Sequence, residues 1–211
     1  MIPTAPAPQP KSARDPDRLP AHPSRVLIAE DEHLVAADLG IKLKDLGYTV
    51  LLATDGEQAT TLAASANPDM GLFDIRMPKK DGLAAASEVY GQYGVPVVIL
   101  SAYAEPELVA QAQKAGVFGY LIKPVQEDQL RAAIEVAWSR YALALKDKAE
   151  AESLKKRLED RRIIEQAKWK LVSTKGITEP DAMTALQKKA RSMRAPLAEV
   201  ALAVMHHGLD V

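Results

Sequence analysis

The chain has 211 residues, of which 47% are hydrophobic and 26% are charged, and its formal net charge at pH 7 is -1. This length allows one complete domain and a smaller second one, with the composition of an ordinary globular protein. The chain has no cysteine, which excludes disulfides and thiolate zinc sites, and no apolar run approaches the roughly 18 residues of a membrane span.

Residues 1–24 form a proline-rich segment with seven of the fourteen prolines of the chain. The segment lacks the apolar central region of a signal peptide, so it is not expected to direct export. Its composition predicts a disordered tail, and a chain without a signal peptide or a span is expected in the cytoplasm, away from membranes.

From residue 25 onward, short apolar runs alternate with amphipathic helical stretches, which is typical of an α/β domain with a doubly wound parallel sheet. The five expected strands are Arg25–Ala29, Thr49–Ala53, Met70–Phe73, Val97–Leu100 and Gly119–Ile122. The expected helices are Glu32–Leu46, Gly56–Ala66, Leu83–Gln92, Glu105–Ala115 and a last one from Gln126 onward. Gly71 interrupts the central strand, where we expect it to weaken local packing.

Polar side chains stand where four of these strands end: Glu30 and Asp31 after the first, Asp74 after the third, Ser101 after the fourth and Lys123 after the fifth. The carboxyl ends of parallel strands meet at one edge of the sheet, where ligands bind. Each residue alone fits a turn or a cap, but the five together predict one site.

The residue types of this site suit phosphoryl transfer to Asp74. A carboxylate that attacks a phosphoryl group needs its charge neutralised, because both partners are anionic. Glu30, Asp31 and Asp74 are predicted to hold Mg²⁺. Lys123 adds a positive charge in reach of a phosphoryl oxygen, and Ser101 offers a hydroxyl that can report the new group. The bond between Lys123 and Pro124 is a candidate cis peptide.

Residues 25–140 resemble the receiver domain of bacterial two-component response regulators, which has a flavodoxin-like fold. The resemblance rests on the following segments, which match in order and spacing: Glu30-Asp31, Asp-Ile-Arg-Met-Pro from Asp74, Ser101-Ala102, and Tyr120-Leu121-Ile122-Lys123-Pro124. It implies that Asp74 accepts a phosphoryl group from a sensor histidine kinase and that the backbone carbonyl of Arg76 joins the Mg²⁺ site. It also implies that Ser101 and Tyr120 form a switch pair, although Tyr120 also fits an ordinary surface aromatic. No enzyme activity is expected beyond slow loss of the protein's own phosphoryl group.

Residues 127–174 contain no Pro or Gly, so the last helix of this domain is predicted to run on until Lys175-Gly176. Residues 141–160 would then be a connector helix. Four apolar residues fall near a heptad seam that Lys148 and Arg161 interrupt: Ala144, Ala151, Leu154 and Leu158. The pattern fits either a homodimer formed on phosphorylation or a solvated connector.

Residues 161–207 are predicted to form a small three-helix bundle. Thr178 is the expected N-cap of the second helix, with Pro180 in its first turn and Asp181 at the capping-box position. The expected core residues are Ile164, Ala167, Leu171, Ala182, Ala185, Leu186, Ala190, Leu197, Val200, Ala201 and Val204. From residue 151 to the end, twelve Lys or Arg face eight Asp or Glu, and this net charge of +4 favours a polyanion partner.

This bundle resembles the ANTAR domain, an output module that binds RNA hairpins and prevents transcription termination. The matching residues are Ile164-Glu165-Gln166-Ala167-Lys168, Gly176-Ile177-Thr178-Glu179, Ala182, Leu186, Leu197 and Val200-Ala201. Trp169 and Lys170 depart from the family pattern. The candidate RNA contacts are Lys168, Trp169, Lys170, Lys188, Lys189, Arg191 and Arg194. The alternatives are a buried Trp169 and a solvated basic helix face.

Together these patterns predict a response regulator that is phosphorylated on Asp74 and controls binding of an RNA hairpin. Two alternatives stay open. In the first, the bundle docks another protein and binds no nucleic acid. In the second, it binds DNA, although no convincing recognition helix follows a tight turn.

Overall fold

The computed structural model describes residues 16–102 and 116–207. The chain divides into two compact units, residues 1–146 and residues 147–211, which we call the receiver unit and the output unit. Each unit is described by itself.

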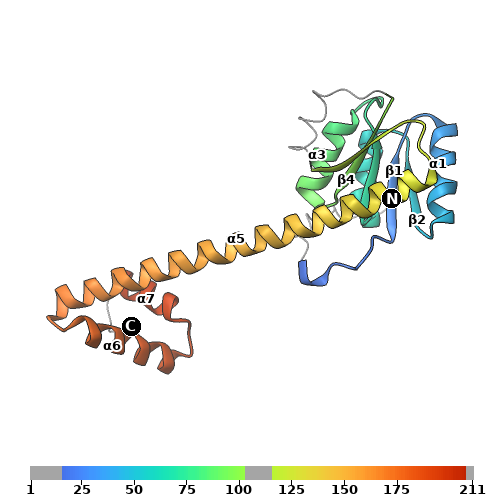
Figure 1. Ribbon diagram of the computed structural model, residues 1–211. Helices are drawn as coiled ribbons and strands as arrows, with labels where there is room; N and C mark the ends of the chain where they lie inside the picture. The colour runs from blue at the N-terminus through green and yellow to red at the C-terminus, as the bar shows by residue number, and fades with distance from the viewer. Residues whose placement is uncertain (1–15, 103–115, 208–211) are drawn as a thin grey trace, which may run out of the picture. The chain divides into compact units, whose positions relative to one another are not determined.

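The receiver unit holds a five-stranded parallel sheet in the order β2-β1-β3-β4-β5 (Figure 1). The strands are β1 Arg25–Ala29, β2 Thr49–Ala53, β3 Met70–Asp74, β4 Val97–Ser101 and β5 Val117–Ile122. The helices are α1 His33–Asp45, α2 Gly56–Ala66, α3 Gly82–Tyr93 and the start of α5 Glu127–Lys175. The predicted doubly wound sheet is confirmed. The predicted helix Glu105–Ala115 lies outside the described residues.

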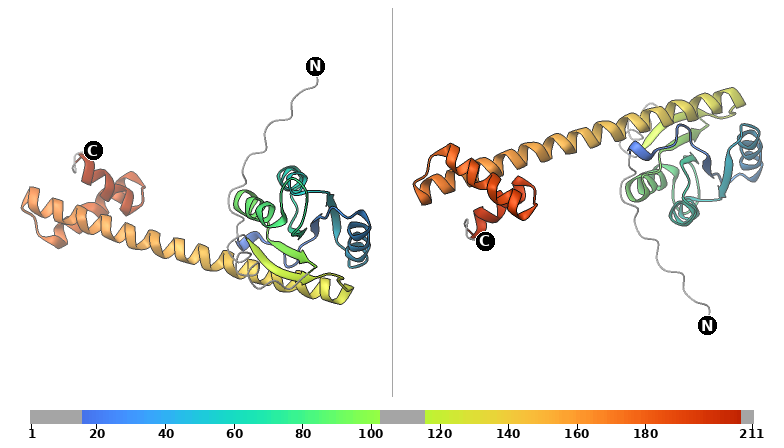
Figure 2. Two further views of the ribbon diagram at one scale, coloured as in Figure 1. Left: turned by 90° about the horizontal axis from the view of Figure 1, so that it is seen from above. Right: turned by 90° about the horizontal axis from the view of Figure 1, so that it is seen from below.

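Helices cover both faces of this sheet (Figures 1 and 2). Side chains alternate between the faces with the period of two of a strand. Val26 and Ile28 of β1 pack with α1 and α5, whereas Leu27 and Ala29 pack with α2 and α3. Every residue of β3 and β4 is buried, as expected for parallel strands that are covered on both sides.

The expectation that Gly71 weakens β3 was wrong. A Cβ atom at Gly71 would lie 2.8 Å from Cε1 of Phe73 and 3.1 Å from Cγ2 of Val97. The ring of Phe73 is fully buried and occupies the space over the glycine. Because an aromatic neighbour fills the gap, the glycine permits dense packing here.

The predicted disordered tail of residues 1–24 was too long. Residues 16–18 form a short 3-10 helix, Leu19 packs against the core, and the carbonyl of Pro20 accepts a hydrogen bond from Nε1 of Trp138 at 3.2 Å. Ser24 donates from its backbone N–H and its hydroxyl to Asp69, both at 2.9 Å. The indole of Trp138 is only 4% exposed, so its N–H needs an acceptor, which this segment provides. Residues 1–15 lie outside the described residues.

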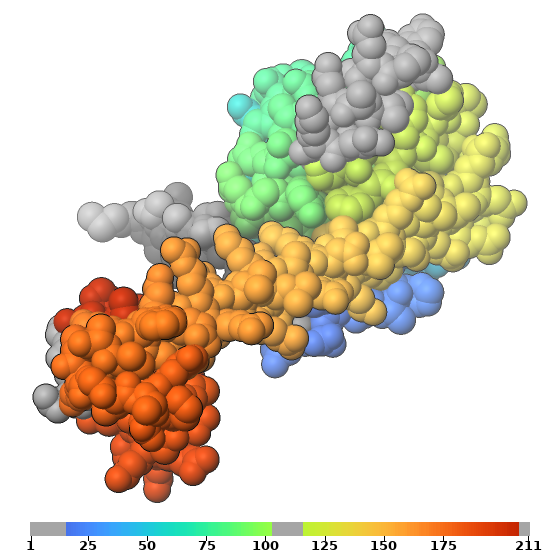
Figure 3. All heavy atoms as spheres, turned by 60° about the vertical axis from the view of Figure 1, so that its left-hand side comes forward, coloured from blue at the N-terminus to red at the C-terminus, as the bar shows by residue number. Residues whose placement is uncertain are grey.

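Helix α5 is continuous over 49 residues, as predicted, and Gly176 follows it with φ +64°. In the receiver unit its residues Leu130, Ile134 and Tyr141 are fully buried. Residues 146–159 are all exposed, and their side chains stand out from the helix in Figure 3. Helix α5 therefore contributes to two separate cores.

The output unit consists of the end of α5 with α6 Glu179–Met193 and α7 Leu197–His207 (Figures 1 and 2). Thr178 caps α6 as predicted, since its hydroxyl accepts from the N–H of Asp181 at 3.3 Å. The predicted apolar faces meet in one core, with Ile164 and Leu197 half-buried against it, whereas Ala185 was wrongly predicted and lies half-buried outside this core. The buried members are Ala167, Leu171, Ala182, Leu186, Ala190, Val200, Ala201 and Val204. Among the described residues, no helix has the length and apolarity to cross a membrane.

Candidate functional site

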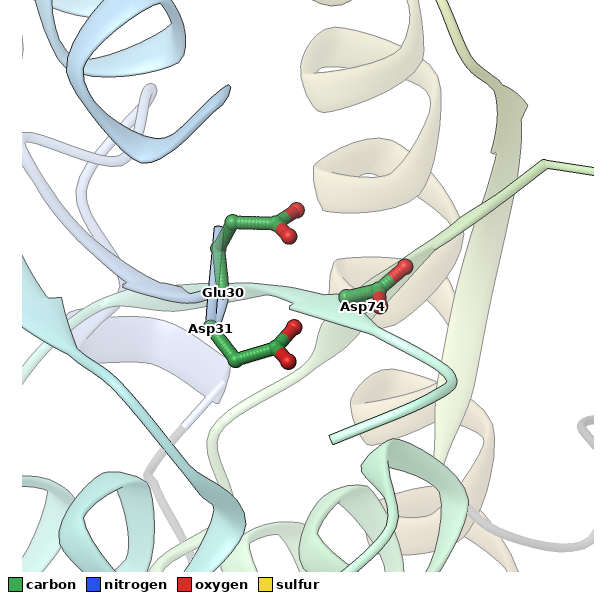
Figure 4. Close-up of side chains that lie close together, drawn as sticks. All are labelled: Glu30, Asp31 and Asp74. Carbon is green, nitrogen blue, oxygen red and sulfur yellow. The ribbon is translucent and has the colours of Figure 1, made fainter. Parts of the chain in front are cut away.

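Three carboxylates meet at the carboxyl edge of the receiver sheet. Glu30 and Asp31 follow β1, and Asp74 ends β3. These strands are neighbours with Ala29 opposite Phe73 in register, so the residues that come next lie side by side. One carboxylate oxygen from each of the three side chains lies within 4.8 Å of the others. Figure 4 shows the three side chains directed toward the same space.

Lys123 joins this cluster from the end of β5. Its backbone N–H donates to the carbonyl of Ser101 at 2.8 Å, which continues the pairing of β5 with β4. Its Nζ lies 2.6 Å from Oε2 of Glu30 and 2.9 Å from Oδ1 of Asp74. The peptide bond between Lys123 and Pro124 is cis, as predicted. One ammonium therefore stands among three carboxyl groups.

Burial controls the electrostatics of the cluster. It raises the pKa of Glu30; the hydrogen bond and charge of Lys123 oppose this increase and the charge of Asp74 adds to it. Burial alone would lower the pKa of Lys123, but its hydrogen bonds to Glu30 and Asp74 outweigh burial and the pKa is raised. Lys123 is therefore positively charged at neutral pH, and the excess negative charge around it favours a further cation.

The donor set fits Mg²⁺. Carboxylate oxygens are the hard ligands that Mg²⁺ prefers, and the ion usually keeps several waters. Asp31 is exposed, whereas Glu30 and Asp74 are buried, so the site is open to water on the side of Asp31. Glu30, Asp31 and Asp74 would hold the ion. Arg76 lies two residues after Asp74, and the contact of its carbonyl with the ion stays a prediction.

The two proposed switch residues lie on β4 and β5. Ser101 is the last residue of β4 and is 7% exposed. Tyr120 of β5 is half-buried and packs against the core cluster of α2 and α3. Ile99 lies opposite Tyr120 in register, and Ser101 lies opposite Ile122. The movement that would make them a switch pair stays a prediction.

Gly82 is a site residue that the sequence reasoning missed. A Cβ atom at Gly82 would lie 1.9 Å from the carbonyl oxygen of Asp74. The N–H of Gly82 donates to the carbonyl of Ile75 at 2.9 Å and closes the loop that follows Asp74. Only glycine fits so close to another backbone. The available signal was the pair Asp81-Gly82, in which Asp81 caps α3.

An ion pair that joins the loops after β2 and β3 was also missed. Nζ of Lys79 lies 2.6 Å from Asp55, whose other carboxylate oxygen caps α2 by accepting from the N–H of Gln58 at 2.9 Å. Lys79 has φ +64°, a conformation unusual for a residue other than glycine. The hydrogen bond from Lys79 lowers the pKa of Asp55, and the one from Gln58 adds to this. The pair fixes the loop that follows Asp74.

A mostly apolar cavity of about 390 Å³ borders Lys123. It lies between α1 and the loop after β5, and its walls are formed by Leu34, Val35, Asp38, Leu39, Lys123, Pro124 and Val125. Leu34 at its rim is 87% exposed. An exposed leucine beside an apolar hollow is typical of a protein contact surface.

In the output unit, two of the seven predicted RNA contacts are used within the protein. Lys168 is 9% exposed and lies 2.9 Å from Glu165 and 2.5 Å from Glu179. Its hydrogen bonds to Glu179 and then Glu165 raise its pKa. Lys170 donates to the carbonyl of Met205 in the last turn of α7 at 2.6 Å. Both cations tie helices of the bundle together, so each already has partners within the protein, and their contact with RNA stays a prediction.

The other five candidates are more accessible. Trp169 is 65% exposed, and Lys188, Arg191 and Arg194 are exposed, whereas Lys189 is half-buried. Within residues 16–102 and 116–207, no ion pair involves any of these four cations. Their charges are therefore free for a polyanion.

Comparison with known proteins agrees with both units. Residues 26–135 match the model of the response regulator receiver domain, and residues 152–205 match that of the ANTAR domain. The transcriptional regulatory protein PdtaR of Mycobacterium tuberculosis is 40% identical over 186 residues, which cover 88% of this chain and 91% of that protein. The regulatory protein AtoC of Escherichia coli is 36% identical over 115 residues, covering 54% of this chain and 25% of AtoC.

Solved structures resemble the receiver part. The signal receiver domain of a modulated diguanylate cyclase from Desulfovibrio desulfuricans is 36% identical, with a TM-score of 0.54 over 58% of this chain and 98% of that one. The N-terminal domain of a three-domain response regulator from Carboxydothermus hydrogenoformans is 31% identical, with a TM-score of 0.53 over 58% of this chain and 99% of that one.

Proposed function

The chain belongs to the response regulators that join a receiver domain to an ANTAR domain, and we propose that phosphorylation of Asp74 by a sensor histidine kinase controls its binding to an RNA hairpin. The observation that carries the phosphorylation step is the cluster of three carboxylates and one ammonium around Asp74. RNA binding that prevents transcription termination is carried by the ANTAR match and the exposed cations Lys188 and Arg191 of α6.

In the proposed reaction, a carboxylate oxygen of Asp74 attacks the phosphorus of a phosphohistidine. The new bond joins this oxygen to phosphorus, the bond between phosphorus and the imidazole nitrogen breaks, and the imidazole leaves with the electron pair and gains a proton from solvent. Bound Mg²⁺ would neutralise the charge of the phosphoryl oxygens. Lys123, already 2.9 Å from Asp74, is placed to pair with one of those oxygens. No other catalysis is proposed beyond slow hydrolysis of the resulting acyl phosphate.

The cavity beside Lys123 supports a protein as phosphoryl donor. Its walls include the exposed Leu34 and Lys123, and the ammonium of Lys123 lies 2.9 Å from Asp74. A partner that covers this surface would bring its phosphohistidine to Asp74 and exclude water from the reaction. A second copy of the chain is a further proposed partner, because Leu154 and Leu158 of α5 are 51% and 70% exposed.

Coupling to the output unit would be a shift between two states. The new phosphoryl group would offer the hydroxyl of Ser101 a further hydrogen-bond acceptor, and Tyr120 would then move inward. On the output side, RNA loops present unstacked bases to aromatic side chains and phosphates to cations. Trp169 is the only aromatic residue after residue 146, and its exposure suits such stacking.

The test measures binding of the full chain to a short RNA hairpin and to duplex DNA, with Mg²⁺ and with or without a small-molecule phosphodonor. We expect the phosphodonor to strengthen hairpin binding in the unchanged protein and to have no effect on Asp74→Asn. The matched control is Asp45→Asn, which alters an exposed carboxylate at the end of α1 and should respond like the unchanged protein.

A response that persists in Asp74→Asn would move the phosphoacceptor elsewhere. Phosphorylation of Asp74 without binding to any hairpin would leave the receiver part of the proposal standing and remove the RNA part.

A further inference from the structure

Helix α6 ends in an unusual way, with an arginine in the left-handed conformation. Arg194 is the C-cap residue, with φ 52° and ψ 36°, and its N–H bonds back to carbonyls of Ala190 and Arg191. Glycine or asparagine usually fills this position, because a Cβ atom makes the conformation strained. An arginine at a position that strains its backbone suggests a functional role for its side chain.

The described chain offers a comparison for this residue. Three residues other than glycine have positive φ: Asn67, Lys79 and Arg194. Asparagine adopts this conformation readily, and the side chain of Lys79 is held 2.6 Å from Asp55. Arg194 is exposed, and among the described residues it has no ion pair. Nothing within this part of the chain pairs with its guanidinium, so we look for a partner outside the described residues.

Two more cations lie close to Arg194 in the chain. Lys188 and Arg191 are three residues apart on α6, which places them on one side of the helix, both are exposed, and Arg194 follows as the C-cap. The acids of α6 stand in its first turn, where Glu179 is already paired with Lys168. Cations near a helix C-terminus are favoured by the helix dipole. That effect accounts for a basic last turn but not for a strained arginine beyond it.

We propose that Lys188, Arg191 and Arg194 form a phosphate-binding edge that grips the backbone of the RNA hairpin, with Arg194 as its outer contact. We call it the α6 basic edge. The inference rests on the RNA binding proposed above and names the residues that carry it. A guanidinium suits this position because it presents a planar fork of donors to phosphate oxygens. Lys168 and Lys170 are excluded because both are engaged within the bundle.

The decisive variant is Arg194→Gly, because it separates binding from stability. Glycine relieves the strain at the C-cap, so the thermal transition of the output unit should stay unchanged or rise by up to about 5 °C. Affinity of the phosphodonor-treated full chain for the hairpin should fall by about three- to tenfold. The slope of log affinity against log salt should become shallower by about one, as for the loss of one phosphate contact.

Two controls accompany it. Arg157→Ala removes an exposed arginine from α5 in the same unit and should change affinity by less than about twofold, because the edge is specific to α6. Arg194→Lys keeps a cation at the C-cap and should retain most of the affinity, whereas Arg194→Asn, which suits the backbone but lacks the charge, should behave like Arg194→Gly.

The other outcomes overturn defined parts of this inference. If the unchanged protein binds the hairpin and Arg194→Gly binds equally well, the α6 basic edge is wrong and the proposed function stands. If the unchanged protein binds no hairpin, the α6 basic edge and the RNA part of the proposed function fail together, and the phosphorylation part stands. If Arg194→Gly weakens binding to duplex DNA as much as to RNA, the edge contacts phosphates without selecting RNA.

Discussion

The receiver unit and the output unit each hold a lysine ammonium between two carboxylates. The two clusters differ in how far these carboxylates are exposed to water. In the receiver unit, Lys123 pairs with Glu30 and Asp74, whose side chains are 0% and 11% exposed. In the output unit, Lys168 pairs with two glutamates whose side chains are 47% and 56% exposed. Water screens the exposed pair, while the buried carboxylates depend on nearby cations.

The receiver cluster also has a third carboxylate, Asp31, and therefore an excess of negative charge. The output cluster has no such neighbour within the residues that the structure describes, and Lys168 serves there to join α5 to α6. The same residue types thus make a candidate cation site in the receiver unit and an ion pair between two helices in the output unit. Burial and charge balance separate the two roles.

The largest expected effect is on phosphoryl transfer. Removing Mg²⁺ with a chelator, or changing Asp31→Asn, should slow phosphorylation of Asp74 by a small-molecule phosphodonor about 100-fold, because the developing charge loses its neutralising partner. Incorporation of labelled phosphate over time measures the rate. Glu165→Gln is the matched change in the output cluster. An equal loss of phosphorylation rate in that variant would contradict a specific role for the receiver carboxylates.

The two lysines should differ in their effect on stability. In the absence of Mg²⁺, Lys123→Met should lower the melting temperature of the receiver unit by about 10 °C, because Glu30 stays buried without its partner. Lys168→Met should lower that of the output unit by no more than about 5 °C, because its two glutamates remain in water. Calorimetry of the full chain follows both transitions, and equal shifts would contradict the role given to burial.

Two glycines offer a third comparison. Gly82→Ala should destabilise the receiver unit by about 3 kcal/mol, because the new Cβ atom meets the carbonyl oxygen of Asp74. Gly176→Ala should cost the output unit only about 1 kcal/mol, because its Cβ atom would meet open space and only the positive φ is strained. Urea denaturation measures both, and a larger loss for Gly176→Ala would reverse the expected order.

The smallest expected effect is on pH dependence, and it should have opposite signs in the two units. The pKa of Asp55 is lowered below its usual 3.8, so its contribution to receiver stability is present above that value and lost as the pH falls through the folded-state pKa. The pKa of Lys168 is raised above its usual 10.5, so its contribution is present below that value and lost as the pH rises through the folded-state pKa.

Asp55→Asn should therefore flatten the acid side of the receiver transition, and Lys168→Met should flatten the alkaline side of the output transition. Melting temperatures measured from about pH 2 to 4 for Asp55 and from about pH 10 to 12 for Lys168 test this expectation. An acid limb unchanged in Asp55→Asn would show that the ion pair with Lys79 adds nothing to stability.

The sequence alone determined the elements of the fold, because their signals lie between neighbours in the chain. Apolar runs predicted all five strands, the stretch without Pro or Gly predicted α5, and Thr178 predicted the start of α6. The order of polar residues after the strands predicted the cluster around Asp74, because parallel strands bring their carboxyl ends together.

Tertiary structure alone decided which charges are free. Lys168 and Lys170 are residue types that commonly contact nucleic acid. When the helices pack, however, Lys168 forms an ion pair with Glu179 and Lys170 donates a hydrogen bond to the carbonyl of Met205. In the same way, Gly82 approaches Asp74 and Pro20 reaches Trp138 across the fold. These contacts depend on distance in space and on burial, which local sequence patterns do not encode. Neighbouring residues in the chain specify the helices and strands, and tertiary packing decides which side chains contact each other.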